Sequence, residues 1–184
     1  SGTNGVPLGI LNQSGIGTVS MGTNGAAFAN SSPSAYSGLD PLIDLESQLD
    51  IANALDGDLA YLTNAKVVAA LKKLKDQYGG YLWTDFDDNI QSTKGTPGMI
   101  NGYPVARSNQ VPFNLSKGTG TNLSAMIFGD FTSLVIGMWG ASEVLVNPYG
   151  AGYNAGSVDI RIMQTCDIAV RYAKKFAVIT DIVA

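Results

Sequence analysis

VDIRIMQTCDIAVRY, Val158–Tyr172, is the clearest strand signal in the chain. Apolar side chains occupy alternate positions in it and only Gln164 interrupts their row, while charged side chains and Thr165 fall on the other face. A single strand of about 15 residues would extend roughly 50 Å, which few compact domains of this size need. A helix from about Thr165 to Phe176 is the alternative that a short apolar pattern leaves open. The pattern favours a long strand.

Two helices and several shorter strands are expected around it. Asp40 is a favourable N-cap, Pro41 suits the first helical position and Gly57 would follow the end, which predicts a helix of about 16 residues. A second helix is expected from Ala65 to about Gln77, with Asn64 as its cap. Shorter strands are expected at 59–62, 81–84, 103–106, 125–131, 134–139, 144–146 and 177–182. The mixture indicates an α+β fold.

The first 38 residues are rich in Gly, Ser, Asn and Thr and contain only short apolar pieces. Such a segment has little core of its own, so it is expected to be an extended arm that lies against another element or a neighbouring subunit.

Composition excludes several classes of function. The chain has 184 residues, of which 45% are hydrophobic and 14% charged, against about a quarter charged in an ordinary soluble domain. This favours burial of apolar surface against partners, although a well-packed monomer is an alternative. The net charge of −4 disfavours a basic nucleic-acid groove. No histidine is present and Cys166 is the sole cysteine, which excludes Ser-His-Asp and Cys-His catalysis, histidine-ligated zinc and an internal disulfide.

Two groups of loop residues are candidate ligand sites. Three glycines, Gly15, Gly17 and Gly22, match neither of the nucleotide-binding spacings, so a flexible arm is the better interpretation. The run of Asp85, Asp87, Asp88 and Asn89 could gather a hard cation, but the glycine and the distal glutamate of a calcium loop are missing. A solvated loop is expected there.

Three further groups are also interpreted as structural. The only glutamates are Glu46 and Glu143, and nothing pairs them for acid–base chemistry. The two tryptophans, Trp83 and Trp139, are expected to lie in a core or an interface. Four lysines, which are Lys66, Lys72, Lys73 and Lys75, surround the second predicted helix and are expected to form a solvated face. We therefore expect no catalytic, cofactor or metal residues, and no enzyme. No apolar run near 18 residues and no signal-like start is present, so neither membrane spanning nor secretion is expected.

The order of these pieces resembles the tailed-bacteriophage major capsid protein family with the Hong Kong 97-type fold. The helix that begins at Asp40 resembles the family's long spine helix. The matching motifs are GVPLGILN at 5–12 for "PxGIL", the block at 62–82 for "N...L..LKD..GxYL", GYPV at 102–105 for "GxPV", FGDF at 128–131 for "fGDf" and 173–180 for "AF.v". They span almost the whole chain in the right order and are specific only together.

The resemblance implies an α+β subunit with two domains. A peripheral domain with the spine helix and the long strand would comprise 37–57 and 132–166. An axial domain with helices around a central sheet would comprise 58–131 and 167–184. Residues 1–36 would be an arm at the base of an extended loop. Only the later part of the family's usual length is matched, without the family's amino-terminal arm and most of the extended loop. The chain is therefore expected to be a fragment that does not assemble without that missing arm.

The resemblance also implies partners. Copies would form hexamers and pentamers of an icosahedral shell around double-stranded DNA, assembled in the host bacterial cytoplasm, with scaffolding or decoration proteins as further partners. Some members join subunits through a Lys–Asn isopeptide bond assisted by a buried Glu. The stretch 160–167 has no Asn and only Asp167 as an acid, so crosslinking is not expected. Three alternatives remain open: an encapsulin-like nanocompartment shell, a secreted β-rich surface or carbohydrate-binding module, and an Asp-based hydrolase.

Overall fold

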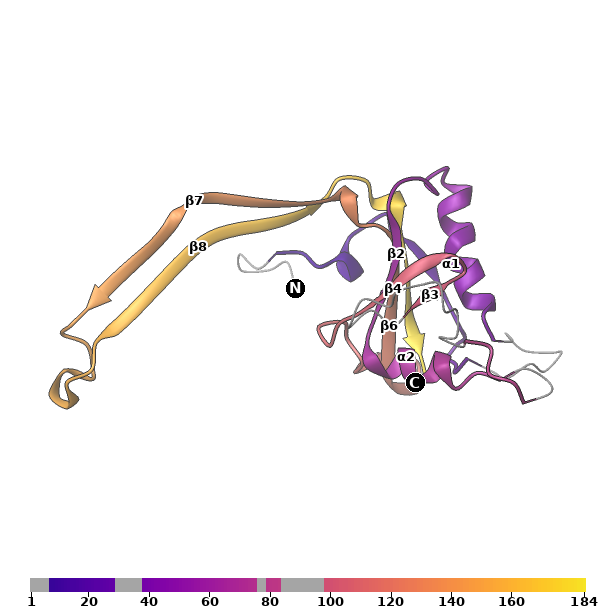
Figure 1. Cartoon of the computed structure of the whole chain (residues 1–184), viewed down its shortest axis with the longest axis horizontal. Coiled ribbons are helices and arrows are strands. Elements are labelled where there is room, and N and C mark those ends of the chain that lie inside the picture. Colours follow the sequence, from indigo (N-terminus) through magenta and orange to yellow (C-terminus); the bar gives the residue numbers. More distant parts are fainter. Residues whose placement is uncertain (1–6, 29–37, 76–78, 84–97) are drawn as a thin grey trace. The chain divides into compact units, whose positions relative to one another are not determined.

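The computed structural model describes residues 7–28, 38–75, 79–83 and 98–184. They form two compact units: a sheet unit, Gln13–Ser133 with Tyr172–Ala184, and a hairpin unit, Ser1–Asn12 with Leu134–Arg171. Most described elements are strands, and two α-helices accompany them in the sheet unit (Figure 1). The α+β class expected from the sequence is confirmed. The grouping into peripheral and axial domains concerns the assembled subunit and stays a prediction.

A seven-stranded mixed sheet forms the centre of the sheet unit. Its strand order is β1-β9-β6-β2-β4-β3, and β5 pairs with β6 beside this path. β1 runs parallel to β9 and β2 parallel to β4, whereas the other pairs are antiparallel. The strands are β1 Gly17–Val19, β2 Leu59–Thr63, β3 Met99–Ile100, β4 Tyr103–Arg107, β5 Leu115–Lys117, β6 Gly120–Asp130 and β9 Phe176–Ile182. Single 3-10 turns are η1 Ile10–Asn12, η2 Phe131–Ser133, η3 Tyr153–Ala155 and η4 Ala173–Lys175.

β6 contains the longest run of buried residues among the described strands. Every residue from Leu123 to Asp130 is buried, since β2 and β9 pair with its two edges. Phe128 lies opposite Tyr61 of β2 and Ala177 of β9, and its ring stacks on the Tyr61 ring with 4.3 Å between centroids. The predicted strands at 59–62, 103–106, 125–131 and 177–182 correspond to β2, β4, β6 and β9. In contrast, the predicted strand at 81–84 is only an isolated bridge from Tyr81 to Lys75, and its last residue lies outside the described residues.

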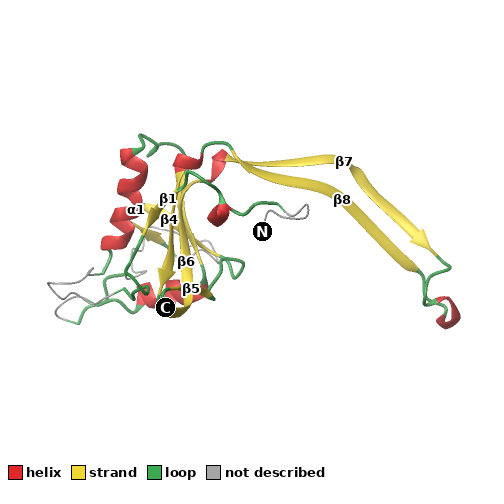
Figure 2. Ribbon diagram, turned by 180° about the vertical axis from the view of Figure 1, so that it is seen from behind, coloured by secondary structure: helices red, strands yellow, loops and turns green. Residues whose placement is uncertain are grey.

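α1, Asp40–Ile51, covers the sheet with three leucines of the hydrophobic core (Figure 2). Leu42, Leu45 and Leu49 are fully buried. The prediction for the start of this helix is wrong. Asp40 is the first helical residue and not the cap, because Leu39 occupies the cap position without a side-chain hydrogen bond.

The helix also ends earlier than predicted. Asn53 adopts a left-handed φ of 51°, its N–H donates to Asp50 O, and the Ala54 N–H donates to Leu49 O. These two bonds form a Schellman motif, which ends α1 several residues before Gly57.

α2, Ala65–Lys72, begins at the predicted cap. The Asn64 side-chain oxygen accepts from Lys66 N–H at 3.0 Å and from Val67 N–H at 3.1 Å, and its amide donates to Pro112 O. The helix stops short of Gln77, because the Lys73 N–H already donates to the carbonyls of the last turn and Lys75 bridges to Tyr81.

Asn64→Ala is expected to lower the free energy of unfolding by about 1 kcal/mol, because two helix N–H groups lose their acceptor. Asn64→Asp keeps that acceptor and is expected to lose less. Urea unfolding followed by far-ultraviolet circular dichroism measures both, and equal losses would contradict the capping role.

The segment expected to be an arm packs on its own chain from residue 13 to 28. β1 pairs with β9, Ala26 bridges to Ile182, and Met21 and Phe28 are buried in the core. This segment was expected to lie against another element or a neighbouring subunit, and residues 17–28 lie against elements of their own chain.

The hairpin unit contains β7, Leu134–Asn147, and β8, Asp159–Val170, which form an antiparallel two-stranded sheet. The long strand predicted from Val158 is confirmed as β8, and the alternative helix from Thr165 is absent from this described segment. The two strands predicted at 134–139 and 144–146 are one strand, with an irregular register between Trp139 and Glu143 where Gly140 has a φ of 71°.

Candidate functional site: the exposed face of the hairpin

One face of the β7–β8 hairpin is almost entirely apolar. Directly opposed residues of an antiparallel pair lie on the same face, and so do alternate residues along each strand. The register pairs Ile136 with Ile168, Val144 with Ile162 and Val146 with Ile160. The apolar face comprises Leu134, Ile136, Met138, Val144, Val146, Ile160, Ile162, Cys166, Ile168 and Val170.

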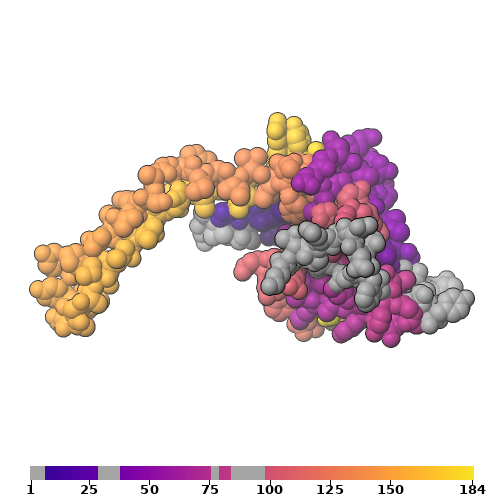
Figure 3. Space-filling model, viewed as in Figure 1, coloured from indigo at the N-terminus to yellow at the C-terminus, as the bar shows by residue number. Residues whose placement is uncertain are grey.

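This apolar face is open to solvent. Ile136, Val146 and Ile162 each expose more than 60% of their surface, at 62%, 61% and 67%. In the space-filling view of Figure 3 the hairpin residues, coloured orange to yellow, form a long narrow strip. An isolated two-stranded sheet is marginally stable in water, and a contiguous exposed apolar face marks an interaction surface. The hairpin is therefore built to be covered by another surface.

A polar pair divides the apolar face. The Ser142 hydroxyl donates to the Gln164 side-chain oxygen, at the point where the strand register is irregular. The opposite face is mixed, with Glu143 and Arg161 beside Leu145. Only the apolar face offers an uninterrupted hydrophobic row on each side of that pair.

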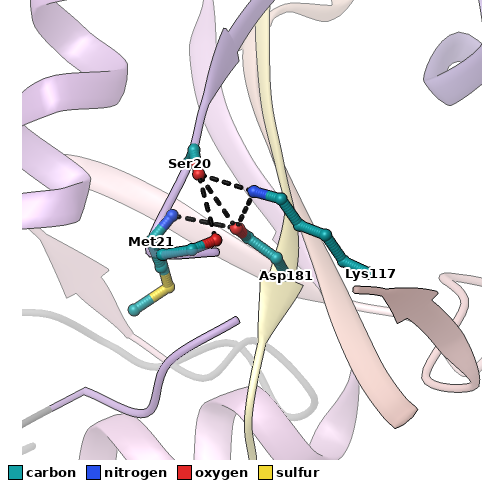
Figure 4. Close-up of polar contacts among 5 residues, drawn as sticks. Ser20, Met21, Lys117 and Asp181 are labelled. Carbon is teal, nitrogen blue, oxygen red and sulfur yellow. Dashed lines mark hydrogen bonds and ion pairs between the residues drawn. The ribbon is translucent and has the colours of Figure 1, made fainter. Parts of the chain in front are cut away.

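Two buried carboxylates in the sheet unit were candidates that the sequence did not single out. Asp181 of β9 is 1% exposed and accepts hydrogen bonds from Met21 N–H, at 3.0 and 3.2 Å to its two oxygens, and from the Ser20 hydroxyl (Figure 4). The Lys117 ammonium pairs with it at 2.7 Å and also donates to Ser20 Oγ. Through these bonds Asp181 fastens residues 20–21 to β9.

Asp130 is the second buried carboxylate, at the end of β6. One oxygen accepts from the Thr132 N–H at 3.0 Å and the Thr132 hydroxyl at 2.6 Å, and the other accepts from the Ser133 hydroxyl and from Lys175 Nζ at 3.0 Å. Burial on its own raises the pKa of Asp130, but the bonds from Thr132, Lys175 and Ser133 outweigh it and lower the pKa to about 2. The carboxylate fixes the segments that precede β7 and follow β8 in sequence.

Gly57 is required beside this carboxylate. A Cβ on Gly57 would come within 2.8 Å of Asp130 Oδ2, and its φ of 96° is a left-handed value.

The sequence pattern that indicates the Asp130 site is the run Asp130-Phe131-Thr132-Ser133. An Asp followed by hydroxyl side chains often accepts hydrogen bonds from its own turn.

The predicted candidates are dispersed. Glu46 is half-buried and accepts from the Tyr61 hydroxyl at 2.6 Å and the Asn101 amide at 3.0 Å, while Glu143 is exposed on the hairpin unit. Burial, and then Glu46, raise the pKa of Tyr61 well above its ordinary value. Trp83 is partly buried against the core, whereas Trp139 is 57% exposed on the hairpin.

The remaining candidates form no site in the described part of the chain. Gly15 precedes β1, Gly17 is its first residue and Gly22 follows it, while the residues Asp85, Asp87, Asp88 and Asn89 lie outside the described residues. Within the described ranges, no group of three or more His, Cys, Asp or Glu side chains is arranged to hold a metal ion. No helix in those ranges is long and apolar enough to cross a membrane.

Solved structures share this fold. The capsid of a native GTA particle superposes with a TM-score of 0.64 at 20% identity, over 96% of this chain and 56% of that one. The Gordonia phage Cozz structure superposes with a TM-score of 0.59 at 19% identity, over 99% and 53%. At such identities the likeness shows the fold, which is that of phage capsid proteins.

Sequence comparison identifies the family. Residues 1–181 match the phage capsid family, so the chain belongs to that family. A curated relative, the major capsid protein of Halomonas phage phiHAP-1, is 26% identical over 186 residues. The alignment covers all of this chain and 25% of that relative, so the chain spans a quarter of the relative's length. The resemblance inferred from the sequence motifs is confirmed.

Proposed function

We propose that this chain is the shell-forming part of a major capsid protein, with a structural role and no catalytic one. Its copies assemble into hexamers and pentamers of an icosahedral virion shell around double-stranded DNA. Assembly takes place in the host bacterial cytoplasm, with scaffolding or decoration proteins as further partners. In the assembled subunit, residues 37–57 with 132–166 would act as the peripheral domain and 58–131 with 167–184 as the axial domain. Family membership supports the proposal.

The observation that carries the proposal is the exposed apolar face of the hairpin. Side chains such as Ile160 and Ile162 contribute nothing to the core of their own chain, since they are 64% and 67% exposed. Each would gain about 1.5–3 kcal/mol if fully buried, so a surface of this kind favours association strongly. A chain that folded to work as a monomer would leave that free energy unused.

The experiment that tests the proposal measures the native mass of the full-length protein that contains this chain by light scattering, with negative-stain microscopy of the same sample. We expect masses of capsomers or closed shells, and nucleic acid inside shells purified from cells. Protein cargo would indicate a nanocompartment instead. A monomer at every protein and salt concentration would contradict the proposal.

A pair of matched variants locates the contact on the apolar face. Val144→Thr with Ile162→Thr keeps β-branched side chains in the strands but removes apolar surface, and we expect association to weaken by at least about tenfold. The control is Leu145→Thr with Met163→Thr, which makes a similar change on the opposite face. Equal weakening by both pairs would show that the apolar face has no special role.

A further inference from the structure

The sheet unit separates its charges between two helices. Residues 40–58, which include α1, contain six acidic residues and no basic one. Residues 66–75, which include most of α2, contain four lysines and no acidic residue. α1 runs alongside the sheet and α2 lies at one end of the strands in both views (Figures 1 and 2).

The outer face of α1 combines acidic and apolar side chains. At 100° per residue, Ile43, Asp44, Ser47, Asp50 and Ile51 fall within a sector of about 120°. Ile43 is 55% exposed and Ile51 is 76% exposed. No described ion pair involves Asp44 or Asp50. These five residues are called the acidic stripe below. A partner that covers the stripe would bury its isoleucines and could pair cations with its aspartates.

α2 offers the opposite combination. Lys66, Ala70 and Lys73 follow one line on the helix, at spacings of four and three residues. Together with Phe28, Leu74 and Val183 they line a hollow of about 280 Å³. The Lys66 ammonium lies 4.7 Å from the centre of the exposed Phe113 ring, which keeps its charge at the surface. This basic hollow has an apolar floor and cationic sides.

Helix dipoles leave two of these charges at unfavourable ends. Asp50 lies in the last turn of α1, where carbonyl groups carry partial negative charge, and Lys66 lies in the first turn of α2, where N–H groups carry partial positive charge. Each position raises the energy of its own helix, and an opposite charge brought from outside would relieve both.

We propose that the acidic stripe of one copy packs into the basic hollow of the next copy. With the helices antiparallel, Asp50 lies beside Lys66 and Asp44 beside Lys73. The rises match, because six residues from Asp44 to Asp50 span about 9 Å and seven from Lys66 to Lys73 span about 10.5 Å. The contact uses different surfaces on the two copies, so it repeats head to tail and can close a ring. It rests on the proposed function, since it requires that copies associate.

Charge reversal tests the pairing in the full-length protein that contains this chain. We expect Asp44→Lys with Asp50→Lys to associate at least about tenfold more weakly than the unsubstituted protein in sedimentation velocity, and Lys66→Glu with Lys73→Glu likewise, because like charges then face each other. A chain that carries all four substitutions, and a mixture of the two double variants, are expected to regain association. Arg107→Glu with Lys174→Glu is the control, since both side chains are exposed and the change in net charge is the same as for the lysine pair. Thermal unfolding of each variant verifies that it is folded.

The outcomes separate this contact from the proposed function. If the unsubstituted protein never associates, the proposed function fails and the contact with it. If it associates and the reversed variants associate equally well, or if neither combination is rescued, only the helix contact is overturned. If the lysine variant loses binding to double-stranded DNA while its self-association is unchanged, the basic hollow serves nucleic acid and the proposal is wrong.

Discussion

Phe128→Ala is expected to lower the free energy of unfolding of the sheet unit by about 3–5 kcal/mol, a large part of the stability of a domain this size. The side chain is fully buried, stacks on Tyr61 and meets the edge of the Tyr103 ring with 5.2 Å between centroids. The loss combines the transfer free energy of the ring with the cost of the cavity left beside the Tyr61 ring on this face of the sheet.

Urea unfolding measures this loss, and the two tryptophans make the signal specific. Trp83 belongs to the sheet unit and Trp139 to the hairpin unit, so fluorescence in a Trp139→Phe background reports on the sheet unit. Phe113→Ala is the matched control, because that ring is 45% exposed. A loss below about 1 kcal/mol at Phe128, or an equal loss at Phe113, would contradict the packing described above.

Asp130→Asn is the second large change, with an expected loss of about 3 kcal/mol at pH 7. The variant keeps the shape of the side chain but leaves a neutral amide facing Lys175 and the Ser133 hydroxyl. Asp56→Asn is the control, because Asp56 pairs with the same ammonium at 3.1 Å but its side chain is 73% exposed. That variant is expected to lose less than about 1 kcal/mol.

The pH dependence of Asp130→Asn distinguishes a charge effect from a packing effect. The pKa of Asp130 in the folded chain is about 2, below its ordinary value of 3.8, so the unfolded chain binds the proton more readily. The stability from this carboxylate, about 2 kcal/mol, is fully present above pH 4 and is lost as the pH falls towards 2. The difference between the original protein and Asp130→Asn should shrink over that range. A difference that stays constant from pH 7 to pH 2 would show that charge is not its cause.

Much of the fold could be predicted from residue patterns, and the failures have local causes. Alternation identified β8 because each of its side chains lies on one of two faces with different composition. The end of α1 was missed because Asn53, and not a glycine, adopts the left-handed conformation. The continuity of β7 was missed because a glycine such as Gly140 usually indicates the end of a strand. Here Gly140 adopts a φ of 71° where the register shifts, and the strand continues beyond it.

The buried carboxylates could not be predicted from a sequence pattern alone, because each has a partner that lies far away in the sequence. Asp181 meets Met21 across 160 positions of the chain, and only the parallel pairing of β1 with β9 brings them together. The apolar face of the hairpin was half visible, since the row on β8 could be recognised alone. Its continuation on β7 depends on the register, which no single strand specifies.

The pairing of β1 with β9 also determines when the sheet can form. Gly17 lies opposite Ala177, so these partners leave the ribosome 160 residues apart, and β6 lacks its β9 neighbour until then. The hairpin strands are separated only by residues 148–158 and can pair earlier, within microseconds of becoming available, while distant strand pairings take milliseconds to seconds. During synthesis the apolar face of the hairpin is therefore exposed before β9 has completed the core of the sheet unit. A nascent chain in this interval is the species on which a chaperone would act, and slower translation after Val170 would lengthen its exposure.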